Sequence, residues 1–158
     1  MICTLAEAVA ERERVKASGF VCAVANGAFD LLHVGHLRYL SAAKELAGPG
    51  GLLVVAVNSD ASVRASKGPK RPIIPQGERA ELVDALKWVD LVVLFDEVDA
   101  RAVLEALHPD LHVKGTDYTA ESVPERDLVA RLGGRTVIAG DPKDHSTTDA
   151  VARIRALE

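Results

Sequence analysis

Short apolar runs recur along the chain at intervals that suit a layered α/β protein. They are rich in β-branched residues and show no alternation between apolar and polar positions. Runs of this kind are typical of strands that are buried on both faces of a parallel sheet. The predicted strands cover residues 20–26, 51–60, 90–96, 111–115 and 135–140.

The segments between these strands have helical periodicity. In residues 36–48, the apolar side chains Leu37, Leu40, Ala43 and Ala47 share one face, and a Gly-Pro pair follows. The other predicted helices cover residues 78–89 (Leu82, Val83 and Leu86 inward), 100–108, 125–134 and 146–158 (Ala150, Ile154 and Leu157 in register).

Alternating strands and helices predict a single domain over residues 1–158, a three-layer α/β/α fold around a five-stranded parallel sheet. A further helix within residues 1–18 is expected to lie outside this core. Residues 65–79 contain three prolines, so this polar stretch cannot be regular throughout.

Composition narrows the class of protein. The net charge of −4 gives no global positive field for binding nucleic acid or an anionic membrane. The N-terminal residues include acids and lack the long apolar stretch of a signal peptide. Cys3 and Cys22 fit no metal or disulfide pattern, and Cys22 is expected in a buried strand. We therefore expect a cytoplasmic protein that does not bind membranes; a homodimer is compatible with the sequence.

Polar residues gather where four of the predicted strands end. Ligands of such folds bind at the carboxyl ends of the strands, so these positions predict a binding site. The residues are His33 and His36 after the first strand, Asn58, Ser59 and Asp60 after the second, Lys114, Gly115 and Asp117 after the fourth, and Ser146, Thr147 and Thr148 after the fifth.

The two histidines around Gly35 admit three interpretations. They could be zinc ligands, although the remaining histidines, His108, His112 and His145, have no motif-like spacing to them. They could be core or surface residues without a chemical role. They could bind phosphate, because a helix that begins near Gly35 offers unpaired N–H groups and the positive end of its dipole.

Two further features favour phosphate chemistry, although the two common glycine-rich phosphate motifs are absent. The "STT" at residues 146–148 offers a second helix start, with hydroxyl groups. Residues 66–76 carry Lys67, Lys70 and Arg71, and this segment could close over a polyphosphate.

The stretch "GAFDLLHVGH" resembles the G-x-F-D-x-x-H-x-G-H signature of the HxGH nucleotidyltransferases, a cytidylyltransferase-like superfamily, and "STT" resembles their second signature. The resemblance covers residues 20–157. It implies a Rossmann-like fold and the transfer of a nucleotidyl group from a nucleoside triphosphate to a phosphate-bearing acceptor, with release of pyrophosphate.

Within this family, "VVAVNSDASVRASKG", "RPIIPQGERAELVDALKWVD" and "PDLHVKGTDY" resemble the adenylyltransferases that act on D-glycero-β-D-manno-heptose 1-phosphate. That resemblance implies ADP-heptose synthesis, as for lipopolysaccharide or another glycan. Such enzymes are often fused to a sugar kinase, and we expect a stand-alone form here.

Departures from the pattern keep two alternatives open. Thr116 replaces a glycine of the heptose type, and Asp144 and His145 replace its glycine and cysteine. Glycerol-3-phosphate cytidylyltransferase is the first alternative, but Asp141 stands where that type carries an arginine. A non-catalytic nucleotide-binding domain on the same fold is the second.

The resemblance also implies roles for individual residues, with Mg²⁺ arriving on ATP and no metal site in the protein. The predicted residues are His33, His36 and Lys67 for catalysis; Asn26, Gly27, Ala28, Phe29, Gly115, Asp117, Ser146, Thr147 and Thr148, with the two histidines, for nucleotide binding; and Asp30, Asn58, Asp60, Arg79 and Lys114 for substrate binding.

Overall fold

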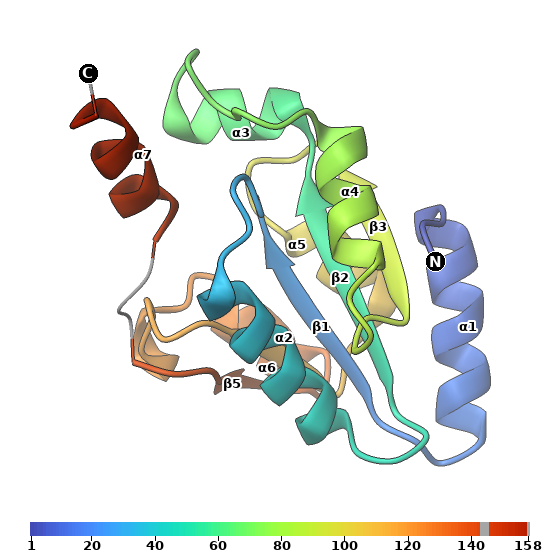
Figure 1. Ribbon diagram of the computed structural model, residues 1–158. Coiled ribbons are helices and arrows are strands. Elements are labelled where there is room, and N and C mark those ends of the chain that lie inside the picture. The colour runs from blue at the N-terminus through green and yellow to red at the C-terminus, as the bar shows by residue number, and fades with distance from the viewer. Residues whose placement is uncertain (143–145, 158) are drawn as a thin grey trace.

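A parallel sheet with the strand order β3-β2-β1-β4-β5 runs through the middle of the computed structural model, which describes residues 1–142 and 146–157 (Figure 1). The order reverses between β1 and β4, and this is the switch point at which such folds bind ligands. The predicted parallel α/β sheet is thereby confirmed. The strands are β1 Cys22–Gly27, β2 Leu52–Asn58, β3 Leu91–Phe95, β4 Leu111–Lys114 and β5 Arg135–Ile138.

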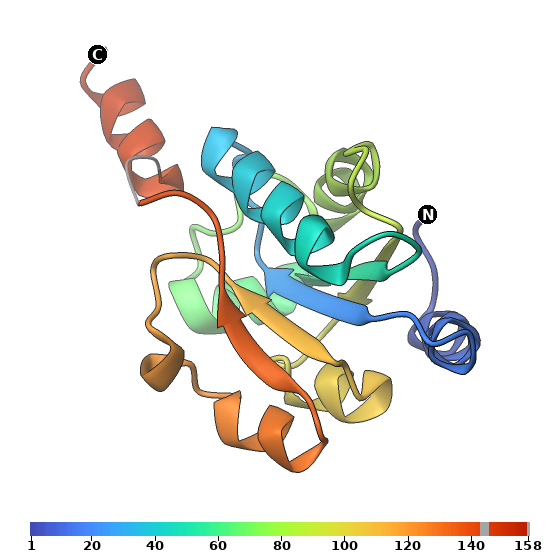
Figure 2. The same ribbon diagram turned by 90° about the horizontal axis from the view of Figure 1, so that it is seen from below.

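Helices cover both faces of the sheet, as the three-layer prediction requires (Figure 2). Helices α2 and α4 pack on one face, and α1, α5 and α6 pack on the other. None of the helices in the described ranges has the length and apolar character that crossing a bilayer requires. The helices are α1 Leu5–Ala17, α2 Val34–Ala47, α3 Asp60–Lys67, α4 Gln76–Asp84, α5 Arg101–Leu107, α6 Arg126–Arg131 and α7 Thr147–Arg155, with a short 3₁₀ helix at Ala120–Ser122.

Neighbouring residues of the central strands enter two different apolar clusters. Val54 of β2 packs under α1 and α5, whereas Val55 packs under α2 and α4, and both are fully buried. Since every strand position faces a helix layer, both positions must be apolar. This explains the continuous apolar runs and the burial of Cys22, which is 1% exposed, as predicted.

Helix α1 belongs to the core, which corrects the expectation that it would lie outside. Ala8 and Val15 join the apolar cluster of that face. Arg12 is also buried, and its Nε donates to the backbone oxygen of His108 at 3.1 Å. The helix starts with a capping box, in which Thr4 and Glu7 bond to each other's backbone N–H groups.

Helix α3 was not predicted from the sequence, and one side chain was misplaced. Its capping signals are present: the hydroxyl of Ser59 accepts from the N–H of Ser62, and Gly68 ends the helix. Lys67 is therefore the last helical residue rather than part of an irregular loop. Leu82 of α4, which was expected to face inward, is 45% exposed.

Helix α7 stands apart from the sheet and from the other helices (Figure 1). None of its described residues is buried, and Ile154 and Leu157 are 58% and 86% exposed. Leu157 lies beyond the end of the helix at Arg155, so the predicted helical register of Ala150, Ile154 and Leu157 is not completed, and these side chains do not pack against the core. The first turn of α7 lies near the strand ends, where Thr147 bonds to the turn after β1.

A histidine lies in the middle of β4 with no exposed surface. The Nε2 atom of His112 is 2.9 Å from Oδ1 of Asn26 on the adjacent strand β1. Burial, and then the charge of Lys114, lowers the pKa of His112 to about 3. The ring is therefore neutral at neutral pH, with Nε2–H donating to Asn26.

This neutral histidine predicts a loss of stability in acid. Below the ordinary pKa of 6.5 the unfolded chain protonates His112, but the folded chain does not until the pH approaches about 3. One such group lowers the free energy of unfolding by up to about 1.4 kcal/mol per pH unit across that window. Replacing His112 with glutamine, which keeps an N–H donor, should reduce the slope by that amount.

Urea denaturation of the wild type and His112→Gln at about pH 7 and about pH 5 measures this difference. His36 contributes with the same sign in both proteins, so the comparison isolates His112. The exposed His108, changed to asparagine, is the matched control for replacing a histidine outside the core. Equal slopes for wild type and His112→Gln would contradict the burial argument.

Candidate active site

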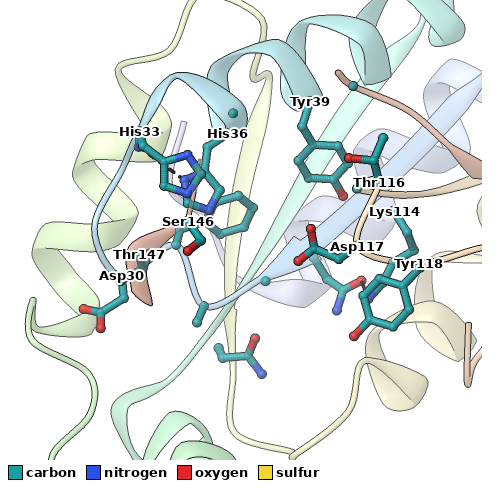
Figure 3. A pocket seen from close by; sticks show the side chains of 18 of the residues that line it. Asp30, His33, His36, Tyr39, Lys114, Thr116, Asp117, Tyr118, Ser146 and Thr147 are labelled. Atoms are coloured by element: carbon teal, nitrogen blue, oxygen red, sulfur yellow. Dashed lines mark hydrogen bonds between the residues drawn. The ribbon is translucent and has the colours of Figure 1, made fainter. Parts of the chain in front are cut away.

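A pocket opens at the carboxyl ends of the strands, at the switch point between β1 and β4 (Figure 3). Most of the predicted site residues meet in its lining, although they come from segments far apart in sequence. The predicted residues that line it are Asn26, Gly27, Ala28, Phe29, Asp30, His33, His36, Asn58, Lys67, Lys114, Gly115, Asp117, Ser146, Thr147 and Thr148.

The turn after β1 is shaped by one aromatic residue in an uncommon conformation. Phe29 has a φ of 49°, in the left-handed region, and is only 3% exposed. Its ring folds back over Gly27, where a Cβ would lie 3.3 Å from Cε2 of Phe29. A side chain at position 27 would press on this ring by a few tenths of an ångström, so glycine gives the ring its closest fit over the turn.

The two signature histidines lie against each other at the start of α2. His33 is the N-cap, and its backbone oxygen accepts from the N–H of His36 at 2.9 Å. The N–H of His33 donates in return to Nδ1 of His36 at 3.4 Å, and the ring centroids are 4.0 Å apart. Because Nδ1 of His36 accepts, its proton belongs on Nε2.

His36 is held in its neutral form. Burial, and then the neighbouring His33, lowers the pKa of His36 to about 4. Lys67 at the end of α3 lowers it further, whereas Asp117 beyond β4 raises it. Three separate segments thus bring charge to bear on one imidazole, which is a neutral N–H donor near pH 7.

The described histidines do not assemble a zinc site. His108 lies at the exposed end of α5, and His112 is buried in β4 against Asn26. Within residues 1–142 and 146–157, no group of three or more His, Cys, Asp or Glu side chains could hold a metal ion. The third candidate, His145, lies outside the described residues, as does Asp144.

Lys114 occupies the floor of the pocket. Its Nζ donates to Oδ1 of Asn26 at 3.2 Å and lies 4.8 Å from the centre of the Tyr118 ring. Burial lowers the pKa of Lys114, while the carboxylates of Glu125 and Asp117 oppose that shift. The lysine is held in place on two sides, from β1 and from the segment after β4.

Asp30 fastens the segment that connects α3 to α4. Its carboxylate accepts from Nη1 of Arg71 at 2.7 Å and from the N–H groups of Ile73 and Ile74 at 2.8 and 3.0 Å. Burial works to raise the pKa of Asp30, but these donors outweigh it and hold the pKa below its usual value. The contacts of Asp30 are therefore mainly structural, although it also lines the pocket.

Arg79 and Asp60 do not line the pocket, unlike the other predicted substrate-binding residues. Arg79 has no exposed surface, and its Nη2 donates to Oδ1 of Asp60 at 2.8 Å. Its other donors reach the backbone oxygens of Ala28 and Ile74. For the fully buried Arg79 this replaces direct substrate contact with positioning, since one guanidinium ties together the turn after β1, the start of α3 and the segment before α4, whereas substrate contact by Asp60 stays a prediction.

Helix α7 brings hydroxyl groups to the histidine end of the pocket (Figure 3). Ser146 caps the helix by accepting from the N–H of Asp149 at 3.0 Å. Thr147 donates to the backbone oxygen of Leu31 at 3.3 Å, which joins α7 to the histidine turn. Both line the pocket, together with Thr148.

Several lining residues were not predicted from the sequence as residues of the site. Tyr39 is buried and donates to the backbone oxygen of Val113 at 2.6 Å, and Glu125 is a buried carboxylate. Asp141 at the rim pairs with Arg38 of α2 at 2.6 Å. The helical pattern of residues 36–48 placed Tyr39 in a helix, and no local signal in the sequence separated Glu125 from ordinary surface acids.

Comparisons with known proteins agree with this geometry. A model of the cytidylyltransferase-like family matches residues 24–153. The bifunctional protein HldE of Syntrophotalea carbinolica is 47% identical over 144 residues, 91% of this chain and 28% of the relative. HldE of Trichlorobacter lovleyi is 45% identical over 139 residues, 88% of this chain and 28% of the relative. The chain thus spans less than a third of the length of these curated relatives.

A solved structure matches over a larger share of its own length. The crystal structure of the lipopolysaccharide core biosynthesis protein from Thermoplasma volcanium GSS1 has a TM-score of 0.67 and 30% identity, and the match covers 79% of this chain and 100% of that one. The family match spans most of the chain and includes the histidine turn. The chain belongs to the cytidylyltransferase-like family of nucleotidyltransferases.

Proposed function

We propose that the chain transfers AMP from ATP to a sugar 1-phosphate, D-glycero-β-D-manno-heptose 1-phosphate, and so forms ADP-heptose and pyrophosphate. The observation that carries this proposal is the close pair of His33 and His36 rings at the start of α2, in one pocket with the start of α7. The similarity to HldE proteins and to a lipopolysaccharide core biosynthesis protein supports a sugar phosphate as acceptor.

The two helix starts are suited to the triphosphate. Helix α2 directs its unpaired N–H groups and the positive end of its dipole toward the pocket. Thr148 adds a hydroxyl donor from α7, next to Thr147, which donates to Leu31, and Lys67 adds a positive charge from α3. We assign the β and γ phosphates to this end of the pocket, and the α-phosphate to the backbone of residues 26–29.

The histidines would stabilise charge during the reaction. The acceptor phosphate attacks the α-phosphorus, the bond from that phosphorus to the bridging oxygen breaks, and pyrophosphate leaves. Since the acceptor is already an anion, no strong base is needed, and positioning with charge stabilisation dominates. A neutral His36 with its proton on Nε2 can donate to a phosphate oxygen as negative charge grows there.

Magnesium is expected to enter with ATP. A metal of this kind usually keeps several waters and takes only one or two protein oxygens, the rest coming from phosphates. The lining offers such oxygens from Asp117, Ser146 and Thr147, so the donors fit a metal that the nucleotide delivers. The ion would screen the charge of the triphosphate and hold it in one conformation.

The acceptor would enter from the opposite end. In an in-line displacement the incoming oxygen and the leaving pyrophosphate lie on opposite sides of the α-phosphorus. Figure 3 shows His33 and His36 at one end of the pocket and Lys114 and Tyr118 at the other. We therefore assign the acceptor phosphate to Lys114.

Asp30, Asp60 and Arg79 would act as positioning residues. Arg79 holds the backbone of Ala28 in place, and Asp30 holds the segment that follows Lys67.

We further propose that the protein works in the cytoplasm, where ATP is available and where the free thiols of Cys3 and Cys22 would stay reduced. A homodimer stays a prediction for measurement of the molecular mass in solution.

Replacing His33 or His36 with alanine should lower kcat about 10² to 10³-fold, with little change in KM for ATP. If His36 acts as a neutral donor, His36→Gln should retain more activity than His36→Ala. Initial rates of pyrophosphate release measure both effects. His108→Asn, outside the pocket, is the control. Near-normal turnover in both alanine variants would sink the assignment.

The segment between α3 and α4 should resist trypsin when nucleotide is bound. Lys67 and Lys70 are exposed, and a bound polyphosphate would draw these lysines inward. We expect ATP with Mg²⁺ to slow cleavage after both, and Asp30→Asn to speed it without nucleotide, because Asp30 fastens the segment. Cleavage after the exposed Lys87 serves as the internal reference. If the cleavage rates after Lys67 and Lys70 were the same with and without nucleotide, the segment would not close over the bound polyphosphate.

ATP should be preferred over CTP as the nucleotide donor. Asp141 stands where the cytidylyl type carries arginine, and it is paired with Arg38. A pocket whose hydrogen-bonding groups match one base leaves some of these groups without a partner when the other base binds. Each unpaired buried group costs about 1–3 kcal/mol, which lowers kcat/KM for the wrong triphosphate roughly tenfold to a hundredfold. Rates with the four triphosphates and heptose 1-phosphate decide this. If CTP matched ATP, glycerol 3-phosphate would be the next acceptor to test.

A further inference from the structure

Glu125 contributes a buried carboxylate to the wall of the pocket. Its side chain is 4% exposed, and it lines the pocket beside Pro124. Its Oε2 is buried and has no hydrogen-bond partner among the described residues. A buried carboxylate oxygen without a donor is costly, so such an atom is expected to meet a donor in the working protein.

The side chain of Glu125 makes few contacts that would stabilise the fold. It is the N-cap of α6, but its side chain makes no capping hydrogen bond. Lys114 in the pocket floor attracts it electrostatically, yet Nζ of Lys114 donates to Asn26 and lies over Tyr118. No ion pair of Glu125 occurs among the described residues. Neither helix capping nor an ion pair accounts for the carboxylate.

A carboxylate at this place selects the kind of group it can bind. It accepts hydrogen bonds from neutral donors such as hydroxyls and repels phosphate oxygens. Lys114 nearby attracts phosphate. A cation and a carboxylate in one part of the pocket match a molecule that carries a phosphate next to hydroxyl groups, and a sugar 1-phosphate is such a molecule.

We propose that Glu125 accepts hydrogen bonds from ring or side-chain hydroxyls of the acceptor sugar while Lys114 holds its phosphate, so that Glu125 sets acceptor specificity. This inference rests on the proposed function, because it assumes that a sugar phosphate enters at the Lys114 end. The ribose of ATP also has hydroxyls, but the in-line geometry puts the acceptor, not the leaving group, at this end.

The test compares Glu125→Gln with wild type in steady-state assays of pyrophosphate release. Glutamine keeps the shape and one acceptor oxygen but loses the charge, so folding should be preserved, which thermal unfolding checks. We expect kcat/KM for heptose 1-phosphate to fall about tenfold to a hundredfold, as for loss of one charged hydrogen bond. KM for ATP should change less than about twofold.

Two controls sharpen the result. Glu121→Gln makes the same chemical change on the exposed 3₁₀ helix, outside the pocket lining, and should behave as wild type. Assays with heptose or hexose 1-phosphates that each lack one hydroxyl identify which sugar hydroxyl donates to Glu125. Removing the right hydroxyl should weaken wild type but not weaken Glu125→Gln further, which a purely structural role would not produce.

The outcomes separate the two proposals. A wild type that neither binds nor turns over any sugar 1-phosphate overturns the proposed function, and this inference with it. An active wild type with an unchanged Glu125→Gln overturns this inference alone. A rise in KM for ATP instead of the sugar phosphate would assign Glu125 to the ribose, and that also overturns it.

Discussion

The burial of the parallel sheet on both faces is the constraint on which the rest of the structure depends. Val54 and Val55 face opposite helix layers, and neither has exposed surface. The fully buried His112 in the sheet is paired with Asn26 of the neighbouring strand. The polar residues of the site therefore lie at the ends of the strands, where loops and the first turns of helices are exposed to solvent.

At these strand ends the position and orientation of neutral hydrogen-bond donors matter more than the net charge of the side chains. The His33 N–H fixes the proton of His36 on Nε2, and burial keeps that ring neutral. A neutral donor is suited to a site that must bind an anion and then release another anion, because it stabilises developing charge without holding the product by a full ion pair. Phe29 and Gly27 set the turn that presents these rings.

The sequence was sufficient for most of the sheet because a continuous apolar run bounded by turn residues fits a strand buried on both faces. It was also sufficient for the histidine turn, since a signature with two histidines and a required glycine is local. It failed where the deciding contact is long-range: the role of Arg79 depends on partners 51 and 19 residues away. Helix α3 was missed because its signal lies in capping by Ser59 rather than in apolar periodicity.

The charges around the pocket have a consequence for how nucleotide is admitted. The described lining holds the carboxylates of Asp30, Asp99, Asp117, Glu125 and Asp141 but only two lysines, Lys67 and Lys114. Arg71, Arg38 and Arg101 pair with three of these acids, Asp30, Asp141 and Asp99, so the two remaining carboxylates balance the two lysines and the wall has no excess of positive charge. Bare ATP, with its full negative charge, is therefore disfavoured relative to its magnesium complex. In the proposed reaction the same balanced wall would hold free pyrophosphate only weakly, so the balance of charge that favours the magnesium complex of the nucleotide would also help to release the product.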